Sequence, residues 1–375
     1  MFLVEVWGVD DFYEQVSDVF WENKDRRNTF RFLKFLAPKS SDEQVKELYV
    51  TLRYIDDLAD LTHGADKETR IAAIEEAKNL FLGPFTSYKS FEDIEETEPG
   101  GRDLLLEFAG LFGRILRGSK PETEAYLRNG FLDLANVMIE DVRSEGVYSL
   151  TNGAVTVEKG ADLKTPGELL EYIKRIQHYP TIMHFKHIGE DPEESLVEDM
   201  SYALMLVKQV RGKELAEDVE MGRVYVSDKE LEDSGISEED FVSIVLNKEQ
   251  DPRMSELVRK RLEWAYGFTK KAVDDLKKEE LPSWIKGYLL TYGHIVKHWV
   301  DRLAENDYQP FKEGCVLETS PGKLDLLRII SKTKGKWETF RNMVGIIGET
   351  KPREYTSADY RNVLDWGEIG LYSSP

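Results

Sequence analysis

Three aspartates lie close together in the stretch ELYVTLRYIDDLAD, residues 47–60. Asp56 and Asp60 are four residues apart and Asp57 lies three before Asp60, so a helix would gather the three carboxylates. Apolar residues recur around them at helical spacing, which predicts a largely buried helix. Such oxygen ligands suit Mg²⁺, which takes one or two carboxylates together with substrate phosphates. The alternative is a solvated acidic face, because 71 of the 375 residues are acidic and such triplets also arise by chance.

A second acidic group lies in the stretch VKQVRGKELAEDVEMGRVYVSDKEL, residues 207–231. Glu214 and Asp218 are four residues apart, and Glu217 lies beside them. The cations of the same stretch are Arg211, Lys213 and Arg223. Two acidic groups on two helices, each with neighbouring cations, could hold Mg²⁺ around a diphosphate from both sides. Ionisation of an allylic diphosphate needs such a site, because the leaving group must be neutralised and water excluded.

The composition restricts the class of protein and its partners. Lys and Arg total 50 against 71 Asp and Glu, and the net charge of −21 disfavours nucleic acid and anionic membranes as main partners. The high charge and the single Cys315, read as an ordinary thiol, fit an intracellular, cytoplasmic protein. The start MFLVEVWGVDDFYEQ lacks a basic n-region, so no signal peptide is expected. No transmembrane segment is expected either, because no run of about 18 uncharged apolar residues occurs.

Helical periodicity extends over most of the chain. Beyond the helix of the first acidic group, helices are expected at residues 11–36, 66–83, 102–117, 121–143, 167–188, 194–219, 238–247, 253–278, 283–304 and 321–345. A polar loop is expected between 84 and 101, and a kink at Pro180. The stretch 146–166 has β-branched residues and an Asn-Gly turn signal, which predict a short β-hairpin. We therefore expect one all-α domain over 1–346 and a polar tail over 347–375.

Histidines form the other group with possible metal chemistry. His178, His184 and His187 invite a zinc interpretation, but no cysteine accompanies them and their spacing is not that of a standard ligand pair. His294 and His298 are four residues apart on an expected helix. For both groups, ordinary core or surface histidines are the favoured interpretation.

Three segments together resemble the squalene/phytoene synthase family, the head-to-head prenyl synthases. TFRFLKFLAP at 29–38 looks like an early conserved segment of the family, and LYVTLRYIDDLAD at 48–60 is close to its DDxxD motif. ELAEDVEMGRVYVSDKEL at 214–231 is similar to its second acidic motif, which continues into GRVY. The likeness runs over roughly residues 20–330. Its late part resembles phytoene synthases around Tyr292, Tyr308, Phe311 and Lys323.

This resemblance implies an all-α class I isoprenoid synthase fold around a central apolar cavity. It implies condensation of two prenyl diphosphates through a cyclopropylcarbinyl diphosphate, with geranylgeranyl diphosphate to phytoene as the favoured reaction. Squalene formation from farnesyl diphosphate, which also needs NADPH, is one alternative. The other is a non-catalytic helical binding protein that kept the fold. The implied cofactor is Mg²⁺, with Mn²⁺ as a substitute. Peripheral membrane association of a protein with a lipophilic product stays open, as does the oligomeric state.

Carried over position by position, the resemblance implies three sets of residues. The catalytic set is Asp56, Asp60 and Tyr225. The diphosphate-binding set is Arg53, Lys213 and Arg223. The metal-binding set is Asp56, Asp57, Asp60, Glu214, Glu217 and Asp218.

The chain departs from the family pattern at two places. In the second acidic motif, Val210 stands where the family has Asn, Lys213 where it has Arg, and Glu214 where it has Asp. Valine cannot bind a metal and glutamate places its carboxylate one methylene further out, so one metal site is expected to be altered. The small residues that leave room for the prenyl chain in the family correspond to Ile176, Gln177 and His178. The sequence therefore determines the substrate less firmly than the fold.

Overall fold

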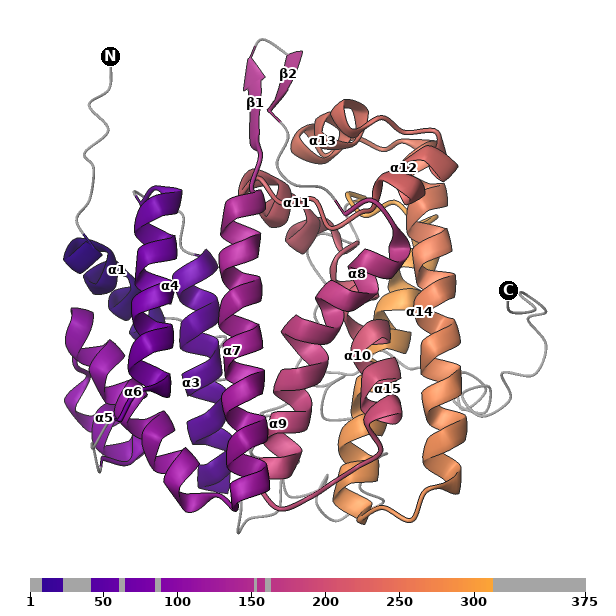
Figure 1. Cartoon of the computed structure of the whole chain (residues 1–375). Helices are drawn as coiled ribbons and strands as arrows, with labels where there is room; N and C mark the ends of the chain where they lie inside the picture. The colour runs from indigo at the N-terminus through magenta and orange to yellow at the C-terminus, as the bar shows by residue number, and fades with distance from the viewer. Residues whose placement is uncertain are drawn as a thin grey trace, which may run out of the picture. The chain divides into compact units, whose positions relative to one another are not determined.

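The computed structural model describes residues 9–22, 42–60, 65–84, 89–151, 154–158 and 163–312. All of them belong to one compact unit, Met1–Lys334, and most are helical (Figure 1). The first helices are α1 Val9–Glu22, α3 Asp42–Asp60, α4 Lys67–Leu82, α5 Phe91–Thr97, α6 Gly101–Gly118 and α7 Pro121–Ser144. After a β-hairpin come α8 Pro166–Ile173, the π-helix η2 Lys174–His178, α9 Tyr179–His187, α10 Glu194–Lys208, α11 Gly212–Glu220, α12 Asp228–Ser234, α13 Glu238–Asn247, α14 Pro252–Lys278 and α15 Ser283–Glu305.

The first half of the fold packs around α3. Leu48, Leu52, Ile55 and Ala59 of this helix are buried, and α3 contacts α1, α4, α6, α7 and α9. These positions are the apolar stripe that the sequence predicted. The opposite face of α3 carries the aspartates, so burial of the stripe fixes the direction in which the carboxylates point.

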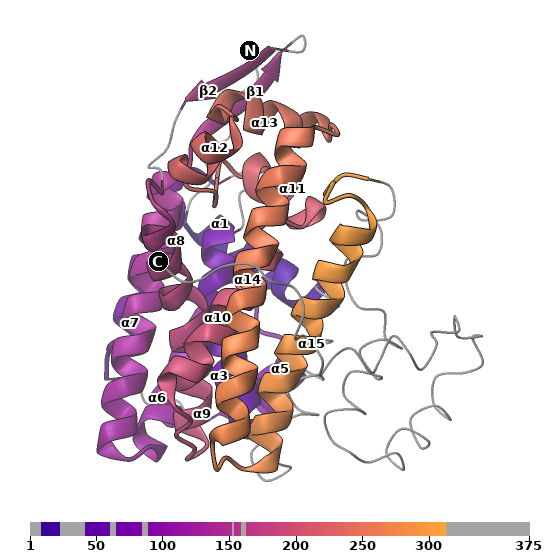
Figure 2. The same cartoon turned by 90° about the vertical axis from the view of Figure 1, so that its right-hand side faces the viewer.

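The second half packs around α10. This helix contacts α14 and α15, which run beside each other in Figure 2. Its apolar residues join a core cluster that also contains side chains of α11, α13, α14 and α15. The last residue of α10 therefore lies close to the start of α11, which carries the second acidic group.

The predicted β-hairpin is confirmed. Strands β1 Val147–Thr151 and β2 Ala154–Glu158 pair antiparallel, with Val147 opposite Glu158 and Thr151 opposite Ala154. Figure 1 shows the hairpin extending beyond the ends of the neighbouring helices, near α13. Its first strand directly follows α7, so the base of the hairpin is anchored to one of the central helices.

Two short helices occupy segments that were expected to be loops. Both α5 and α12 begin with a capping box, in which Ser90 pairs with Asp93 and Ser227 pairs with Glu230. In each box the serine side chain accepts from a backbone N–H while the acid accepts from the serine backbone. Apolar periodicity cannot reveal a helix of two turns, whereas the capping residues could have done so.

Two long predicted helices are interrupted. The helix expected over 194–219 breaks at residues 209–211, between α10 and α11. Gly212 begins the new helix so close to another segment that an added Cβ would lie 2.1 Å from the Pro310 carbonyl oxygen. The helix expected over 167–188 contains the π-helix Lys174–His178, whose wide turn lets Tyr179 N–H donate to Lys174 O. This irregularity comes before Pro180, where the kink was expected.

Parts of the expected organisation lie outside the described residues. These are the second part of the helix expected over 11–36, the helix expected over 321–345 and the boundary between 1–346 and 347–375. The division into a domain and a tail therefore stays a prediction. Among the described helices, none is both long and apolar enough to cross a membrane.

Candidate active site

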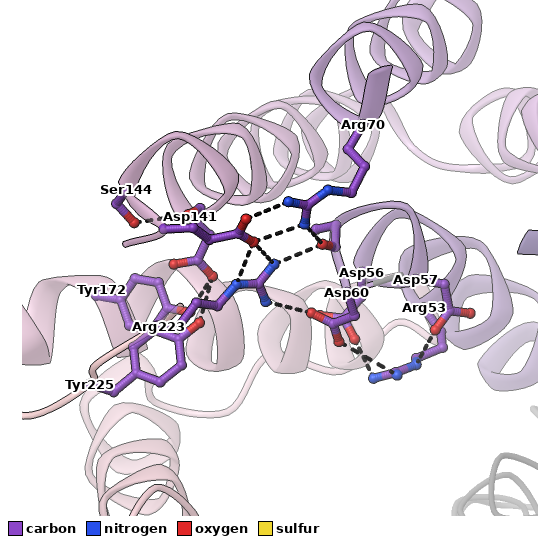
Figure 3. Close-up of polar contacts among 12 residues, drawn as sticks. Arg53, Asp56, Asp57, Asp60, Arg70, Asp141, Ser144, Tyr172, Arg223 and Tyr225 are labelled. Carbon is purple, nitrogen blue, oxygen red and sulfur yellow. Dashed lines mark hydrogen bonds and ion pairs between the residues drawn. The ribbon is translucent and has the colours of Figure 1, made fainter. Parts of the chain in front are cut away.

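The predicted acidic group of α3 does gather around one cation. Arg53 forms ion pairs with Asp56 and, at 3.1 Å, with Asp57 Oδ1, and its Nη2 lies 3.9 Å from Asp60 Oδ2. Asp57 is buried, whereas about a third of the Asp56 and Asp60 side chains is exposed. Arg53 therefore holds the three carboxylates on one side of the helix, as Figure 3 shows. The predicted contact between Arg53 and a diphosphate stays a prediction.

Arg223 joins the end of α3 to two other parts of the chain. Its Nη1 donates to Asp60 Oδ1 at 2.7 Å and its Nη2 donates to Ala59 O at 2.7 Å. Its Nε and Nη2 also donate to Glu145 Oε1 at 3.1 and 3.0 Å. Arg70 of α4 reaches the same glutamate, so two arginines share one buried carboxylate (Figure 3). We call Arg70, Glu145, Arg223 and Asp60 the arginine network.

A close approach of two glycines positions Arg223. Gly222 has φ +84°, in the left-handed region that favours glycine. An added Cβ there would lie 2.2 Å from the Gly146 carbonyl oxygen, and Gly146 N–H donates to Gly222 O at 2.7 Å. The backbone before Arg223 is thereby pressed against the base of the hairpin, beside Glu145. The GRVY segment thus needs its glycine for a steric reason.

Asp141 of α7 forms a second buried group with two tyrosines. Tyr172 OH donates to Asp141 Oδ2 at 2.7 Å and Tyr225 OH donates to the same oxygen at 2.9 Å. The two rings stack with their centroids 5.0 Å apart (Figure 3). Burial raises the pKa of Asp141 to about 6, although Arg223 and the two hydroxyls oppose the shift. Tyr225, predicted as catalytic, thus lies beside the arginine network.

Asp218 is the member of the second acidic group that faces the first. Burial raises its pKa to about 8; Lys208 opposes this shift and Asp60 adds to it. Asp218 and Asp60 therefore lie near each other, and Arg223 also acts on both. The predicted approach of the two acidic groups is realised by these two residues.

The other two acids of the second group point elsewhere. Glu214 Oε1 forms an ion pair with Arg211 at 3.0 Å, and the Arg211 guanidinium lies over the Trp299 ring of α15. Glu217 pairs with Lys213 at 3.6 Å, and more than half of each side chain is exposed. Both predicted roles, metal binding by the two acids and diphosphate binding by Lys213, stay predictions. Val210, in place of the family's asparagine, is fully buried.

The acids nearest each other suit a divalent cation that is also held by a substrate. Asp56, Asp60 and Asp218 supply carboxylate oxygens from two helices. Burial raises the pKa of Asp56 and Asp218, so an additional cation beside them would stabilise their ionised forms. Among the described residues, no three acidic, histidine or cysteine side chains are already arranged to hold a metal ion. Mg²⁺ commonly takes one or two carboxylates and completes its octahedron with water and phosphate oxygens. The residues present therefore fit Mg²⁺ bound together with a diphosphate.

Sequence reasoning did not assign four members of this site: Arg70, Asp141, Glu145 and Lys208. Asp141 carried a visible signal, because it is an acid within the apolar stretch FLDLANVMIEDV. Glu145 and Arg70 carried no such signal, because they bind each other and lie 75 residues apart in the chain. Burial lowers the pKa of His178, His184 and His187 to about 4, so these three histidines are neutral at physiological pH.

Comparison with known proteins identifies the family. The model of the squalene/phytoene synthase family matches residues 24–321. The chain belongs to the squalene/phytoene synthase family. This family condenses prenyl diphosphates head to head. The fold is similar to the crystal structure of a dehydrosqualene synthase in complex with ligand, with a TM-score of 0.56 and 13% identity. The likeness covers 87% of this chain and 96% of that one. None of the curated proteins matches the chain.

The comparisons confirm the expected fold class. An all-α fold shared with a dehydrosqualene synthase agrees with the class that the resemblance implied. At 13% identity this structural likeness concerns the fold alone. The second acidic motif of this chain is altered. Its substrate, product and site residues therefore do not follow from the fold.

Proposed function

We propose that this chain condenses two molecules of geranylgeranyl diphosphate head to head and releases phytoene. The single observation that carries the proposal is the proximity of Asp60 of α3 to Asp218 of α11, beside the arginine network. A diphosphate binds where cations and metal-ligating carboxylates meet. The first condensation would release one diphosphate and one proton and give a cyclopropylcarbinyl diphosphate. The second ionisation releases the other diphosphate, and after rearrangement a proton leaves to give phytoene.

The chain's own residues orient the reacting groups. Arg53 holds Asp56, and Arg223 holds Asp60, so neither carboxylate can turn away from the other. The hydroxyls of Tyr172 and Tyr225 donate to the Asp141 carboxylate and hold it in its buried position beside Arg223. Mg²⁺, when held by Asp56, Asp60 and Asp218, would supply the positive charge that stabilises the departing diphosphate.

Tyrosines of two helices would meet the prenyl chains. Tyr49 lies on the aspartate face of α3, and it acts electrostatically on Tyr288 and Tyr292 of α15. The hydroxyls of Tyr288 and Tyr292 are 2.5 Å apart, and both side chains are partly buried. We propose that these rings flank the hydrocarbon and exclude water, and that their π faces stabilise the carbocation.

A second candidate is condensation of the shorter farnesyl diphosphate to a C30 product. The three bulky tyrosines favour it. Squalene as the product would require hydride from NADPH, whereas a dehydro product would require proton loss instead. Incubation with each prenyl diphosphate, with and without NADPH, followed by mass analysis of the extracted hydrocarbon, decides. A C40 product supports the proposal, and a C30 product replaces it with the second candidate.

A non-catalytic binding protein is the remaining alternative, favoured by Val210 and by the outward placement of Glu217. Thermal melts with Mg²⁺ and a non-hydrolysable prenyl diphosphate separate it from an enzyme. A ligand that binds the native state raises its stability, so a synthase should gain most when both are present together. Absence of any joint stabilisation, together with absence of hydrocarbon, would contradict the proposed function.

A further inference from the structure

Arg261 of α14 is a fully buried arginine to which the proposed reaction gives no role. Its Nε and Nη2 donate to the two carboxylate oxygens of Glu230 at 2.9 and 2.6 Å, so the guanidinium and the carboxylate pair through two parallel hydrogen bonds. Glu230 lies in α12, which packs against α14. The simplest interpretation is a structural ion pair that joins these two helices.

The ion pair alone does not explain an arginine at this position. Taking two charges out of water costs free energy that their attraction often only offsets, and well-packed apolar side chains of similar volume are often as stabilising. Arg261 also makes contacts outside the pair. Its Nη1 donates to Tyr225 O at 2.8 Å, and a longer bond of 3.4 Å reaches Gln209 Oε1. The planar fork of an arginine can serve such separate acceptors together, whereas a lysine ammonium is a single point.

The Tyr225 carbonyl belongs to the segment 223–227, which lies between α11 and α12. The end of this segment is also tied to Arg261, because Glu230 Oε2 accepts from the backbone N–H of Ser227 at 3.0 Å and from its hydroxyl at 2.8 Å. Arg261 therefore holds the middle of the segment directly and the end of the segment through Glu230.

The same segment carries two side chains of the candidate site. Arg223 donates to Asp60 of α3, and the Tyr225 hydroxyl donates to Asp141 of α7. Arg261 binds the backbone of the segment from α14. Because a single residue separates Arg223 from Tyr225, a shift of the backbone at Tyr225 would displace both side chains from their partners.

We propose that Arg261 is a positioning residue for the condensation, which fixes the backbone of 223–227 and thereby the places of Arg223 and Tyr225. The inference rests on the proposed function, because it assumes that these two side chains act in the reaction. A misplacement of about 1 Å that originates far from the chemistry can lower a rate about 10²-fold. Loss of Arg261 should therefore slow the reaction although every side chain of the candidate site is still present.

Two variants that differ only in whether Arg261 is present test this role. Glu230→Gln removes the partner's charge but keeps an oxygen that can accept from Ser227, and it keeps the Arg261 donor to Tyr225 O. The double variant, Glu230→Gln with Arg261→Met, leaves no buried charge of this pair without a partner, but it lacks that donor. The comparison isolates what Arg261 contributes beyond the ion pair.

Initial rates and amide hydrogen exchange of the full-length variants are two independent measurements. With Mg²⁺ and the prenyl diphosphate that the wild type converts, kcat of the double variant should lie about ten- to a hundredfold below that of Glu230→Gln. Its KM should change by less than about threefold, because the groups that would bind the substrate are kept. Peptides that cover 223–227 should exchange faster in the double variant, since their backbone has lost a fixed contact.

Two further variants complete the design. Arg261→Lys keeps a charge for Glu230 but loses the fork, so compared with the wild type it should also lower kcat in a folded protein. This comparison replaces the first if Glu230→Gln does not fold. Arg259→Met is the matched control, because Arg259 lies in the same helix and pairs with Glu256 and Glu263 of that helix. It should leave both kcat and the exchange of 223–227 unchanged.

Equal kcat values and equal exchange in Glu230→Gln and the double variant would overturn the inference and leave a structural ion pair, with the proposed function intact. Faster exchange with an unchanged kcat would also overturn it, because the segment could then move without consequence for the reaction. Absence of hydrocarbon from the wild type with either prenyl diphosphate would instead refute the proposed function and the inference together. Melting curves confirm that each variant is folded before it is assayed.

Discussion

The outer acids of the groups on α3 and α11 are four residues apart in both cases, but the two groups have different environments. Asp56 and Asp60 remain on one face, where Arg53 and Arg223 bind them. Glu214 pairs with Arg211, which lies over Trp299 of α15, and Glu217 pairs with Lys213 at the surface, whereas Asp218 lies within electrostatic reach of Asp60 on α3. Four-residue spacing places two side chains on one face of a helix, but the neighbours of that helix decide what the face meets.

The helix break explains much of the difference. A continuous helix over 194–219 would carry the acids on the same rod as the apolar stripe of α10. The break at 209–211 and the contact of Gly212 with the Pro310 backbone give α11 its own direction. The following experiments test whether the two groups really differ as the structure indicates.

Removal of the central arginine should have the largest effect. Arg223→Met breaks the buried ion pairs with Asp60 and Glu145, so that Glu145 keeps Arg70 alone and Asp60 keeps only the more distant Arg53, and the free energy of unfolding should fall by about 3–5 kcal/mol. Urea denaturation measures the change. Arg259→Met, which removes a half-buried arginine with helical neighbours Glu256 and Glu263, should change the stability far less. Similar losses in both variants would contradict the central position of Arg223.

Neutralising one acid of each group should affect activity very differently. Asp56→Asn should lower the rate of hydrocarbon formation about 10²–10³-fold, since it removes a carboxylate at the developing charge. Glu217→Gln should change the rate by less than about threefold, because its exposed pair with Lys213 contributes little. Initial rates with Mg²⁺ and labelled prenyl diphosphate provide the measurement. Equal losses would show that Glu217 contributes to the reaction as much as Asp56 does.

The two groups should respond oppositely to pH. Although burial opposes ionisation of Asp60, Arg223 and Arg53 lower its pKa, so its stabilisation is present above the unfolded pKa and lost as pH falls. Asp218 has a folded pKa of about 8, so the native state binds the extra proton and loses stability as pH rises to that value.

Urea denaturation of the metal-free variants across about pH 4 to 8 measures this contrast. Asp218→Asn should become more stable than wild type as pH rises, by at most about 1.4 kcal/mol per pH unit. Asp60→Asn should be less stable than wild type at neutral pH, and this deficit should shrink only at the acidic end of that range, where wild type begins to lose the Asp60 contribution. Parallel pH profiles for the two variants would refute the contrast.

Lys213 should show the smallest effect. The family motif assigns it a diphosphate contact, but its side chain is mostly exposed and paired with Glu217. Lys213→Gln should therefore change diphosphate affinity by less than about threefold, as is typical of an exposed ion pair. A tenfold loss in calorimetric titration would restore the role that the motif assigned.

The sequence predicted those features that depend on local patterns. Apolar periodicity predicted the long helices, and β-branched residues with an Asn-Gly pair predicted the hairpin. The break before Gly212 was missed because the Pro310 carbonyl, against which Gly212 packs, lies far along the chain. The sequence suggested that the two acidic groups act together, but which of their residues lie near each other needed the folded structure, since spacing does not reveal which helices meet. Glu145 and Arg70 needed the folded structure for the same reason.

The wide turn Lys174–His178 has a consequence for comparing relatives. A π-helical turn accommodates one residue more than an α-helical turn, so every side chain after it is rotated about 100° from its position on an unbroken helix. A relative with a regular α-helix in place of Lys174–His178 would have one residue fewer in that turn. A sequence alignment would then need a one-residue gap in the relative before α9. An ungapped alignment would then match each residue of Tyr179–His187 to the neighbour of its true structural counterpart.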